Sequence, residues 1–372
     1  MPTTWTSSHP LRAVTGILVF LILLHYLTTR TPPPRARNVR PAAPTPPNDS
    51  LDVNSPLAVP LQLRANATLL VLCRNSDLGA LLLTMQQLED RFNGRYGYPW
   101  LFLNDEPFTD EFKLRVSRMT DASVTFGSIP PAAWEQPHWI NASLAERVRK
   151  SMALSRVPHG ESLSWRNMNR FNAGFLFDHE LLKDYRYYWR VEPGVKYFCN
   201  IVEDPLLFME NNRKSYGFSM ANRGVLQAAY TLWEAVYDFT QENSHLVPKD
   251  NFLRFVSDDA GDSYNLCQYW NNFEMADMDF WRSDAYRRFF DYLDRKGGIY
   301  YERWSASAIQ SIALSLFAPK SQMHFFDNIG YRHEPHQHCP QGEAWTRGRC
   351  WCDPTDNFDT HENSCLAHWE RL

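Results

Sequence analysis

One stretch constrains the fold of this chain more than any other: residues 185–201, Tyr-Arg-Tyr-Tyr-Trp-Arg-Val-Glu-Pro-Gly-Val-Lys-Tyr-Phe-Cys-Asn-Ile. Its aromatic and β-branched start predicts a buried strand. Pro193 cannot donate a backbone hydrogen bond and Gly194 turns freely, so we expect the strand to end there. Because one residue separates Arg190 from Glu192, both side chains point to the same face of an extended chain.

These two charges allow two interpretations. At the carboxyl end of a strand in an α/β sheet, they would face the crevice in which ligands usually bind. Apolar neighbours make an unpaired carboxylate costly, so Glu192 would need a cation as its partner. Alternatively, Arg190 and Glu192 form a purely structural ion pair in the sheet. Perturbed charges in clefts mark functional sites often enough to keep the first interpretation open.

The composition argues against one class of partner. Of the 372 residues, 44% are hydrophobic and 14% are aromatic, which suffices for a large core. The formal net charge of −4 exerts no general attraction on nucleic acid. The sequence also shows neither a basic stripe nor a helix-turn-helix pattern, so we expect no nucleic-acid partner.

An apolar run near the N-terminus predicts a membrane segment. Residues 13–27 are almost entirely apolar, with Arg12 before them and Arg30 after them. The run is short beside the roughly 17–25 residues that span a bilayer, and a cleaved signal peptide has a core of similar length. Because no small-x-small cleavage site follows, we favour an uncleaved signal-anchor helix over residues 13–29.

Two kinds of signal disagree about the orientation of this segment. Arginines are more numerous after it than before it, which would place the downstream side in the cytoplasm. However, three Asn-x-Ser/Thr sequences, at Asn48, Asn66 and Asn141, and all seven cysteines lie downstream, as in a lumenal protein. Large domains translocate largely regardless of charge. We therefore predict a cytoplasmic tail at residues 1–12, with the rest of the chain in the lumen.

The lumenal part divides into a stem and a domain. Residues 30–62 are rich in proline and cannot form a core, so they predict an extended stem. Residues 63–372 alternate strand and helix patterns, which predicts an α/β domain with a mostly parallel sheet and helices on both faces. The clearest strand patterns cover residues 66–74, 98–106 and 123–126.

Three groups of polar residues could contribute to a site, and each has a structural alternative. Arg74 and the cluster Asn104-Asp105-Glu106 follow strands, where a nucleotide could bind, although we favour helix capping for Asp105 and Glu106. Arg166 and Arg170 share one helix face, which suits either a diphosphate or ordinary solvent exposure.

The third group lies further along the chain. Glu274 stands among large apolar residues, so its carboxylate is either paired or used in chemistry. Asp277 and Asp279 match the Asp-x-Asp pattern that holds a metal in many nucleotide-sugar transferases. We favour helix capping for them, because apolar residues follow directly.

The C-terminal histidines and cysteines permit either zinc binding or disulfides. His333, His336 and His338 precede a group of four cysteines, which together could hold zinc. In an oxidising lumen the same cysteines favour disulfides, and this is our expectation. Because seven is odd, at least one thiol is free or pairs between chains.

Several separated motifs together carry a family resemblance. They are residues 98–109 (Tyr-Pro-Trp-Leu-Phe-Leu-Asn-Asp-Glu-Pro-Phe-Thr), 187–195 (Tyr-Tyr-Trp-Arg-Val-Glu-Pro-Gly-Val), 271–275 (Asn-Asn-Phe-Glu-Met), 297–304 (Gly-Gly-Ile-Tyr-Tyr-Glu-Arg-Trp), 329–333 (Ile-Gly-Tyr-Arg-His), and His-Cys-Pro at 338–340 followed by Cys-Trp-Cys-Asp-Pro at 350–354. With these motifs the chain resembles the fungal KTR group of α-1,2-mannosyltransferases, which is glycosyltransferase family 15. The resemblance implies a GT-A-like fold and a lumenal Golgi enzyme. Such an enzyme transfers mannose from GDP-mannose to mannose-terminated glycans of glycoproteins, with retention and with Mn²⁺ as cofactor.

The resemblance also assigns roles by position. Glu192 is similar to the family's metal-binding carboxylate, and His333 is similar to its metal-binding histidine. Arg74 and Arg190 match basic positions expected near the nucleotide phosphates. Glu274 matches the carboxylate proposed as the nucleophile, or as the group that holds the acceptor and stabilises the sugar cation. The resemblance does not decide between a covalent intermediate and entry of the acceptor on the face from which GDP departs.

The chain departs from the family pattern at three positions. Trp165 stands at a donor-site position where the family usually has tyrosine, and it keeps a stacking plane. Ala306 replaces an acidic residue, and Asn169 stands where cysteine is common. These changes leave a second hypothesis open, namely a lumenal binding or scaffold protein that has lost turnover. Transfer of mannose phosphate instead of mannose is a related possibility.

Overall fold

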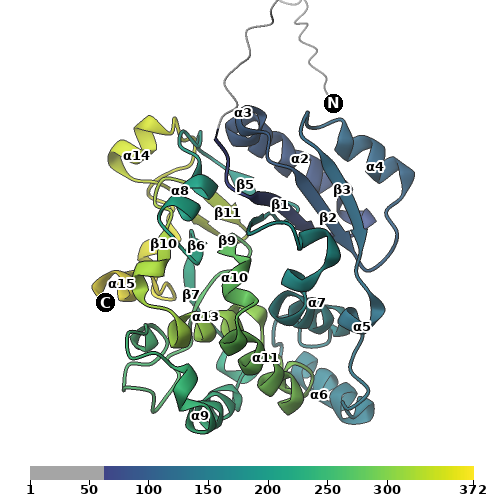
Figure 1. Cartoon of the computed structure of the whole chain (residues 1–372), viewed down its shortest axis with the longest axis vertical. Coiled ribbons are helices and arrows are strands. Elements are labelled where there is room, and N and C mark those ends of the chain that lie inside the picture. Colours follow the sequence, from purple (N-terminus) through teal and green to yellow (C-terminus); the bar gives the residue numbers. More distant parts are fainter. Residues whose placement is uncertain (1–62) are drawn as a thin grey trace, which may run out of the picture. The chain divides into compact units, whose positions relative to one another are not determined.

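Seven strands form the central sheet of the computed structural model, which describes residues 63–372 (Figure 1). They are Ala67–Leu72 (β1), Trp100–Asn104 (β2), Val124–Ser128 (β3), Tyr187–Arg190 (β4), Tyr216–Phe218 (β6), Glu274–Asp277 (β9) and Met323–Phe325 (β10). Their order is β10-β6-β9-β4-β1-β2-β3. Only β9 runs antiparallel to its neighbours, so the predicted mixed, mostly parallel sheet is confirmed.

Helices cover both faces of this sheet. Alternate residues of β1 join different hydrophobic clusters, with Leu70 on one face and Leu69 and Val71 on the other. The first cluster includes residues of Leu163–Gly174 (α7), Leu232–Glu242 (α9), Asp284–Lys296 (α11) and Ala306–Phe317 (α13). The second includes residues of Leu78–Leu88 (α2), Asp110–Ser117 (α4) and Pro205–Asn211 (α8). Figure 1 shows α2 and α4 near the top of the view, and α7, α9 and α11 toward the bottom.

Local sequence signals set several helix boundaries. The side-chain oxygens of Thr109, Ser162, Ser283 and Ser305 cap α4, α7, α11 and α13, each accepting a backbone hydrogen bond within the first turn. Gly297 ends α11 in the left-handed region at φ 75°, which glycine adopts without steric cost.

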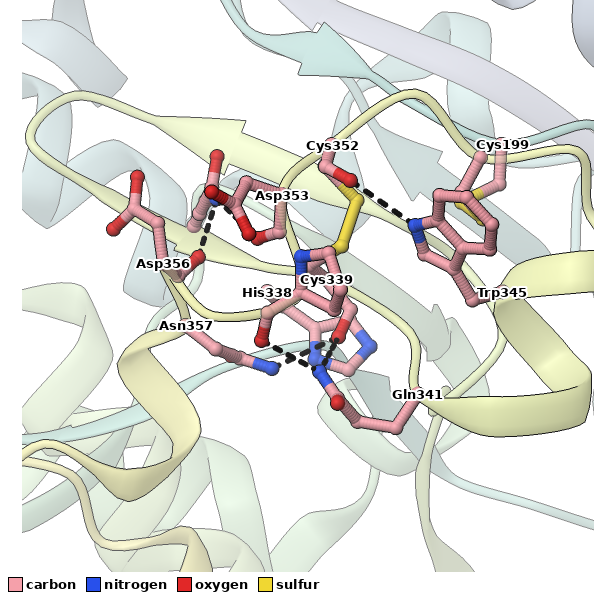
Figure 2. The surroundings of a disulfide bond; sticks show 12 residues. Cys199, His338, Cys339, Gln341, Trp345, Cys352, Asp353, Asp356 and Asn357 are labelled. Atoms are coloured by element: carbon pink, nitrogen blue, oxygen red, sulfur yellow. Dashed lines mark hydrogen bonds between the residues drawn. A yellow bond between two sulfur atoms is a disulfide. The ribbon is translucent and has the colours of Figure 1, made fainter.

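A second sheet of three strands follows the order β12-β11-β5. The strands are Lys196–Tyr197 (β5), Tyr331–His333 (β11) and His336–His338 (β12). Two disulfides, Cys199–Cys350 and Cys339–Cys352, connect the ends of β5 and β12 to one loop. Figure 2 shows this region, where the indole of Trp345 donates to the carbonyl of Cys352 at 3.0 Å. The small sheet is thus fastened by covalent bonds as well as by its strand pairing.

The expected disulfides are confirmed. A third one, Cys267–Cys365, ties the strand Cys267–Tyr269 (β8) to the C-terminal segment, and Cys73 is a buried free thiol. Within residues 63–372, no group of three or more histidine, cysteine, aspartate or glutamate side chains is arranged to hold a metal, so the zinc alternative has no support.

The predicted tail, signal-anchor helix and stem lie outside the described residues. Across the part of the chain that the structure covers, no helix combines the length and apolar character needed to cross a bilayer. The membrane anchor therefore stays a prediction from the sequence.

Candidate active site

A cleft of about 640 Å³ opens beyond the carboxyl end of β4. Arg190 and Glu192 line it from the end of that strand, Trp165 from α7 and His333 from the small sheet. The side chains of Arg190 and Glu192 meet at 2.6 Å, as expected for residues on one face of an extended chain. The turn at Gly194, with φ 88°, then leads the chain into β5.

An adjoining hollow of about 320 Å³ contains Arg74. It shares His159, Trp165 and Met168 with the larger cleft, so the two form one continuous depression. Arg74 follows β1, donates to the hydroxyl of Ser164 and is half-exposed. The structure therefore brings together five of the six predicted site residues: Arg74, Trp165, Arg190, Glu192 and His333.

The meeting of Glu192 with His333 depends on the small sheet. β11 pairs antiparallel with β5, which places Tyr331 opposite Tyr197 and brings the end of β11 back toward β4. The Nε2 atom of His333 lies 3.3 Å from a carboxylate oxygen of Glu192. Its Nδ1 atom lies 3.1 Å from the carbonyl oxygen of Glu334, which can only accept a hydrogen bond. Nδ1 therefore donates to Glu334, and Nε2 is the atom that faces Glu192.

This pair of residues fits a divalent cation. A carboxylate oxygen and an imidazole nitrogen that face each other are both ligand atoms for Mn²⁺ and related metals. Burial alone would raise the pKa of Glu192, but the charge of Arg190 and the contact with His333 outweigh burial and lower it. Glu192 is therefore ionised, as a metal ligand must be.

Arg190 has capacity for a further anion. Its side chain is 4% exposed, and its Nε and Nη1 atoms have no hydrogen-bond partner among residues 63–372. Only Nη2 is engaged, with Glu192. A guanidinium with free donors beside a cleft is suited to bind phosphate oxygens.

Glu274 lies next to Arg190 but does not line the cleft. It is paired directly opposite Arg190 between β9 and β4, and it is 1% exposed. It accepts hydrogen bonds from the hydroxyls of Tyr188 at 2.8 Å and Tyr216 at 3.2 Å. Burial raises its pKa, and the charge of Arg190 opposes this shift without cancelling it. Its role as nucleophile or sugar-cation stabiliser stays a prediction.

Two arginines that could have bound a diphosphate have structural roles instead. Arg170 forms a buried ion pair with Asp294 at 2.8 Å. Arg166 is fully buried and donates to the backbone carbonyls of Gly160, Ser162 and Glu302. Neither the diphosphate interpretation nor the solvent-exposed alternative is correct, because α7 is surrounded by other elements.

The Asp-x-Asp pair also has a structural role. Asp277 accepts from the backbone of Asp279 at 3.0 Å and caps the helix Met278–Trp281 (α10), and it pairs with Arg186 at 2.8 Å. Asp279 stands in the first turn of the same helix and is largely exposed. The preference for helix capping is confirmed for Asp277.

Sequence reasoning named Asn104 as a possible nucleotide-site residue, but it missed Asn272, Arg303 and His159, which also line the depression. The side-chain amides of Asn104 and Asn272 are almost fully buried and have no hydrogen-bond partner among the described residues. Asn104 lines the smaller hollow, and Asn272 lines the larger one together with Arg303. Asn272 and Arg303 stand inside the quoted motifs, which was the only available signal. His159 carries no sequence signal at all.

Comparisons with known proteins agree with this geometry. A family described as glycolipid 2-alpha-mannosyltransferase matches residues 35–372. The chain belongs to this family. It is 44% identical over 310 residues to alpha-1,2 mannosyltransferase KTR1 of Saccharomyces cerevisiae, covering 83% of this chain and 79% of that protein. It is 42% identical over 303 residues to glycolipid 2-alpha-mannosyltransferase 2 of Candida albicans, covering 81% of this chain and 66% of that protein.

Two solved structures of this glycosyltransferase family share the fold. The mannosyltransferase Ktr4p of Saccharomyces cerevisiae in complex with GDP matches with a TM-score of 0.79 and 38% identity, over 82% of each chain. Core-mannan synthase A of Aspergillus fumigatus, in its Mn/GDP form, matches with a TM-score of 0.75 and 36% identity, over 84% of this chain and 86% of that one. The predicted GT-A-like fold and the predicted family are thereby confirmed.

Proposed function

We propose that this glycosyltransferase is a retaining α-1,2-mannosyltransferase that moves mannose from GDP-mannose to mannose hydroxyls of O-linked or N-linked glycans. The observation that carries the proposal is the Glu192–His333 pair beside Arg190 at the carboxyl end of β4. The activities for which the relatives are named, the GDP in the Ktr4p structure and the Mn/GDP form of the Aspergillus enzyme support it.

The charges in the cleft suit the departure of GDP. As the bond between mannose and the diphosphate breaks, negative charge develops on the leaving oxygens and must be stabilised. Arg190 offers unpaired donors for this charge, and Arg74 offers a second guanidinium in the adjoining hollow. Glu192 and His333 would hold Mn²⁺, which supplies further positive charge to the diphosphate when it is bound.

The same residues leave a defined role for Glu274. The sugar that loses GDP becomes similar to an oxocarbenium ion, which a carboxylate stabilises by charge or by forming a bond. We propose that Glu274 provides this negative charge from β9, close to Arg190. The hydroxyls of Tyr188 and Tyr216 hold its carboxylate in place.

Enzymes of this kind work on glycans in the secretory pathway, and the sequence outside the described residues is consistent with that. We propose a single-pass type II protein of the Golgi membrane, with residues 1–12 cytoplasmic, 13–29 spanning the membrane, 30–62 as the lumenal stem and 63–372 as the lumenal catalytic domain. Protease treatment of sealed microsomes tests this arrangement, because only the short tail should be removed.

Transfer by the full-length protein tests the proposed activity. Incubation with GDP-mannose, Mn²⁺ and α-methyl mannoside should give a disaccharide whose α-1,2 linkage is read by NMR. Glu192→Ala and His333→Ala should each lower transfer at least about a hundredfold, whereas Asp279→Ala, at an exposed position, should retain it. A protein that binds GDP but transfers mannose to no mannoside would instead be a scaffold.

A further inference from the structure

Arg303 is a buried cation that pairs with no carboxylate among the described residues. Its side chain lines the cleft and is 8% exposed. Its Nε atom is buried without a hydrogen-bond partner, and within residues 63–372 its guanidinium forms neither an ion pair nor a side-chain hydrogen bond. Each of the other buried arginines has a partner for its charge or its donors. Arg170 pairs with Asp294, Arg190 pairs with Glu192, and Arg166 donates to backbone carbonyls.

Among residues 63–372, aromatic rings provide the only contact that compensates this charge. The guanidinium carbon of Arg303 lies 4.4 Å from the ring centroid of Trp165. The imidazole of His159 stacks on Trp165 at 5.7 Å with an interplanar angle of 7°. Burial lowers the pKa of Arg303 to about 10, so the side chain is still charged at neutral pH. A cation–π contact compensates only part of the cost of burying a charge.

The absence of a carboxylate goes together with the three departures from the family pattern. The backbone N–H of Ala306 donates to the side-chain oxygen of Asn169 at 2.8 Å. The amide of Asn169 in turn donates to the backbone carbonyl of Trp165 at 2.8 Å. Trp165, Asn169 and Ala306 therefore belong to one hydrogen-bonded network beside Arg303, and none of them supplies negative charge.

We propose that Arg303, Trp165 and His159 form a subsite for a phosphate group, distinct from the Glu192–His333 pair. An anion that enters the cleft would give the guanidinium of Arg303 a partner for its charge and its hydrogen bonds. The planar fork of a guanidinium matches phosphate oxygens. The phosphate would come from a phosphorylated sugar acceptor or from the nucleoside diphosphate of the donor. The acceptor source rests on the function proposed above, whereas the subsite itself does not.

Binding measurements without divalent metal test the subsite independently of transfer. Calorimetry on the full-length protein would compare mannose 6-phosphate with mannose, and we expect only the phosphorylated sugar to bind. Arg303→Gln should weaken that binding at least about tenfold. Arg223 is the matched control, because it lines the same cleft but is exposed and donates to the carbonyl of Asn265. Arg223→Gln should change the affinity by less than about twofold.

A second variant keeps the test valid if Arg303→Gln does not fold. Ala306→Asp restores an acidic residue in the first turn of α13, where it suits the helix dipole. It should weaken binding of mannose 6-phosphate to a similar degree, and thermal unfolding would verify that each variant is folded. Unchanged affinity in the folded variants would overturn the subsite.

Measurements of GDP binding and of mannose transfer show which compound supplies the phosphate. They also test the subsite separately from the proposed function. If Arg303→Gln weakens GDP binding and mannose 6-phosphate does not bind, the subsite belongs to the donor diphosphate. If α-methyl mannoside is mannosylated, but Arg303→Gln changes the binding of neither GDP nor mannose 6-phosphate, the proposed subsite is wrong and the proposed transferase activity is supported. Binding that depends on Arg303 without any transfer would support the subsite and contradict the transferase.

Discussion

Two different kinds of structure support the two residues of the proposed metal site. Glu192 follows β4, a strand in the middle of the central sheet, where Tyr187 and Trp189 are fully buried. His333 ends β11, in a three-stranded sheet that disulfides fasten. Hydrophobic packing therefore fixes the carboxylate, whereas covalent links and a small sheet fix the imidazole.

These two kinds of support imply two ways in which the site can lose its geometry. Loss of packing around β4 affects the core that the whole domain shares, so stability and activity should fall together. Loosening of the small sheet can move His333 away from Glu192 while the core stays folded. The following changes separate these two modes.

Trp189→Ala should give the largest effect. Trp189 is fully buried and contacts Phe92, Tyr197 and Phe273. Removing such a side chain leaves a cavity and should lower the free energy of unfolding by about 3–5 kcal/mol. Denaturant unfolding measures this change, with the 56% exposed Trp351 replaced by alanine as the control. An equal loss of unfolding free energy in both variants would mean that packing around β4 is not the main source of the domain's stability.

Removal of the Cys339–Cys352 disulfide should act on the small sheet. The bridge closes a loop with a sequence separation of 13, and loop-closure entropy assigns about 3 kcal/mol to a loop of that size. We expect the double serine variant to need about tenfold more Mn²⁺ for half-maximal transfer, because a displaced ligand weakens metal binding.

The Cys267–Cys365 bridge provides the control for this change. It closes a longer loop, with a separation of 98, so its removal should cost at least as much stability. It does not touch the small sheet, so the Mn²⁺ requirement should stay the same. Equal Mn²⁺ requirements in the two double variants would show that the disulfide does not position His333.

Glu274→Gln tests the part of the site that the central sheet supports. The substitution removes the negative charge opposite Arg190 while keeping the shape of the side chain. If the charge stabilises the reacting sugar, kcat should fall on the order of a hundredfold, equivalent to about 2.7 kcal/mol, with little change in the KM for GDP-mannose. Tyr216→Phe, which removes only one hydrogen bond to Glu274, should have a smaller effect. A normal kcat would remove Glu274 from the mechanism.

The sequence predicted the positions of Arg190 and Glu192, at the end of β4, better than that of His333, at the end of β11. The strand ending at Arg190 and the shared face of Arg190 and Glu192 follow from local patterns, and both are present. The approach of His333 spans 141 positions of sequence and depends on pairing between β5 and β11. Local periodicity carries no information about such pairing, so only the family resemblance connected the two residues.

Burial and pairing of polar groups were equally hidden from the sequence. The spacing of Arg166 and Arg170 placed them on one helix face. However, Arg170 pairs with Asp294, and Arg166 donates to the carbonyl of Glu302 as well as to nearby carbonyls. Asp294 and Glu302 are each more than a hundred residues away. The unpaired state of Arg303 is also a tertiary property, because it depends on which side chains do not reach it. Preference for disulfides followed from composition, whereas their connectivity required the fold.

The smallest expected effect concerns the strand that joins the two regions. His324 lies on β10, the last strand of the central sheet before β11, and its ring packs 4.4 Å from that of Phe208. Burial, together with the charge of Lys214, lowers the pKa of His324 to about 4. The unfolded chain keeps the ordinary pKa and therefore takes up a proton more readily. Stability is then complete above the ordinary pKa of about 6.5, and is lost as the pH falls toward 4.

Because His324 is partly exposed, we expect the loss at pH 5 to be only about 1 kcal/mol. His324→Gln cannot be protonated and should flatten the dependence of unfolding free energy on pH between 6.5 and 4. His245→Gln, at an exposed position, should leave the wild-type slope. If acid weakens β10 ahead of the whole domain, the wild-type protein should also lose Mn²⁺-dependent transfer before it unfolds, which would place the junction of the two regions among the determinants of the site. Parallel slopes for wild type and His324→Gln would show that folding does not lower the pKa of His324.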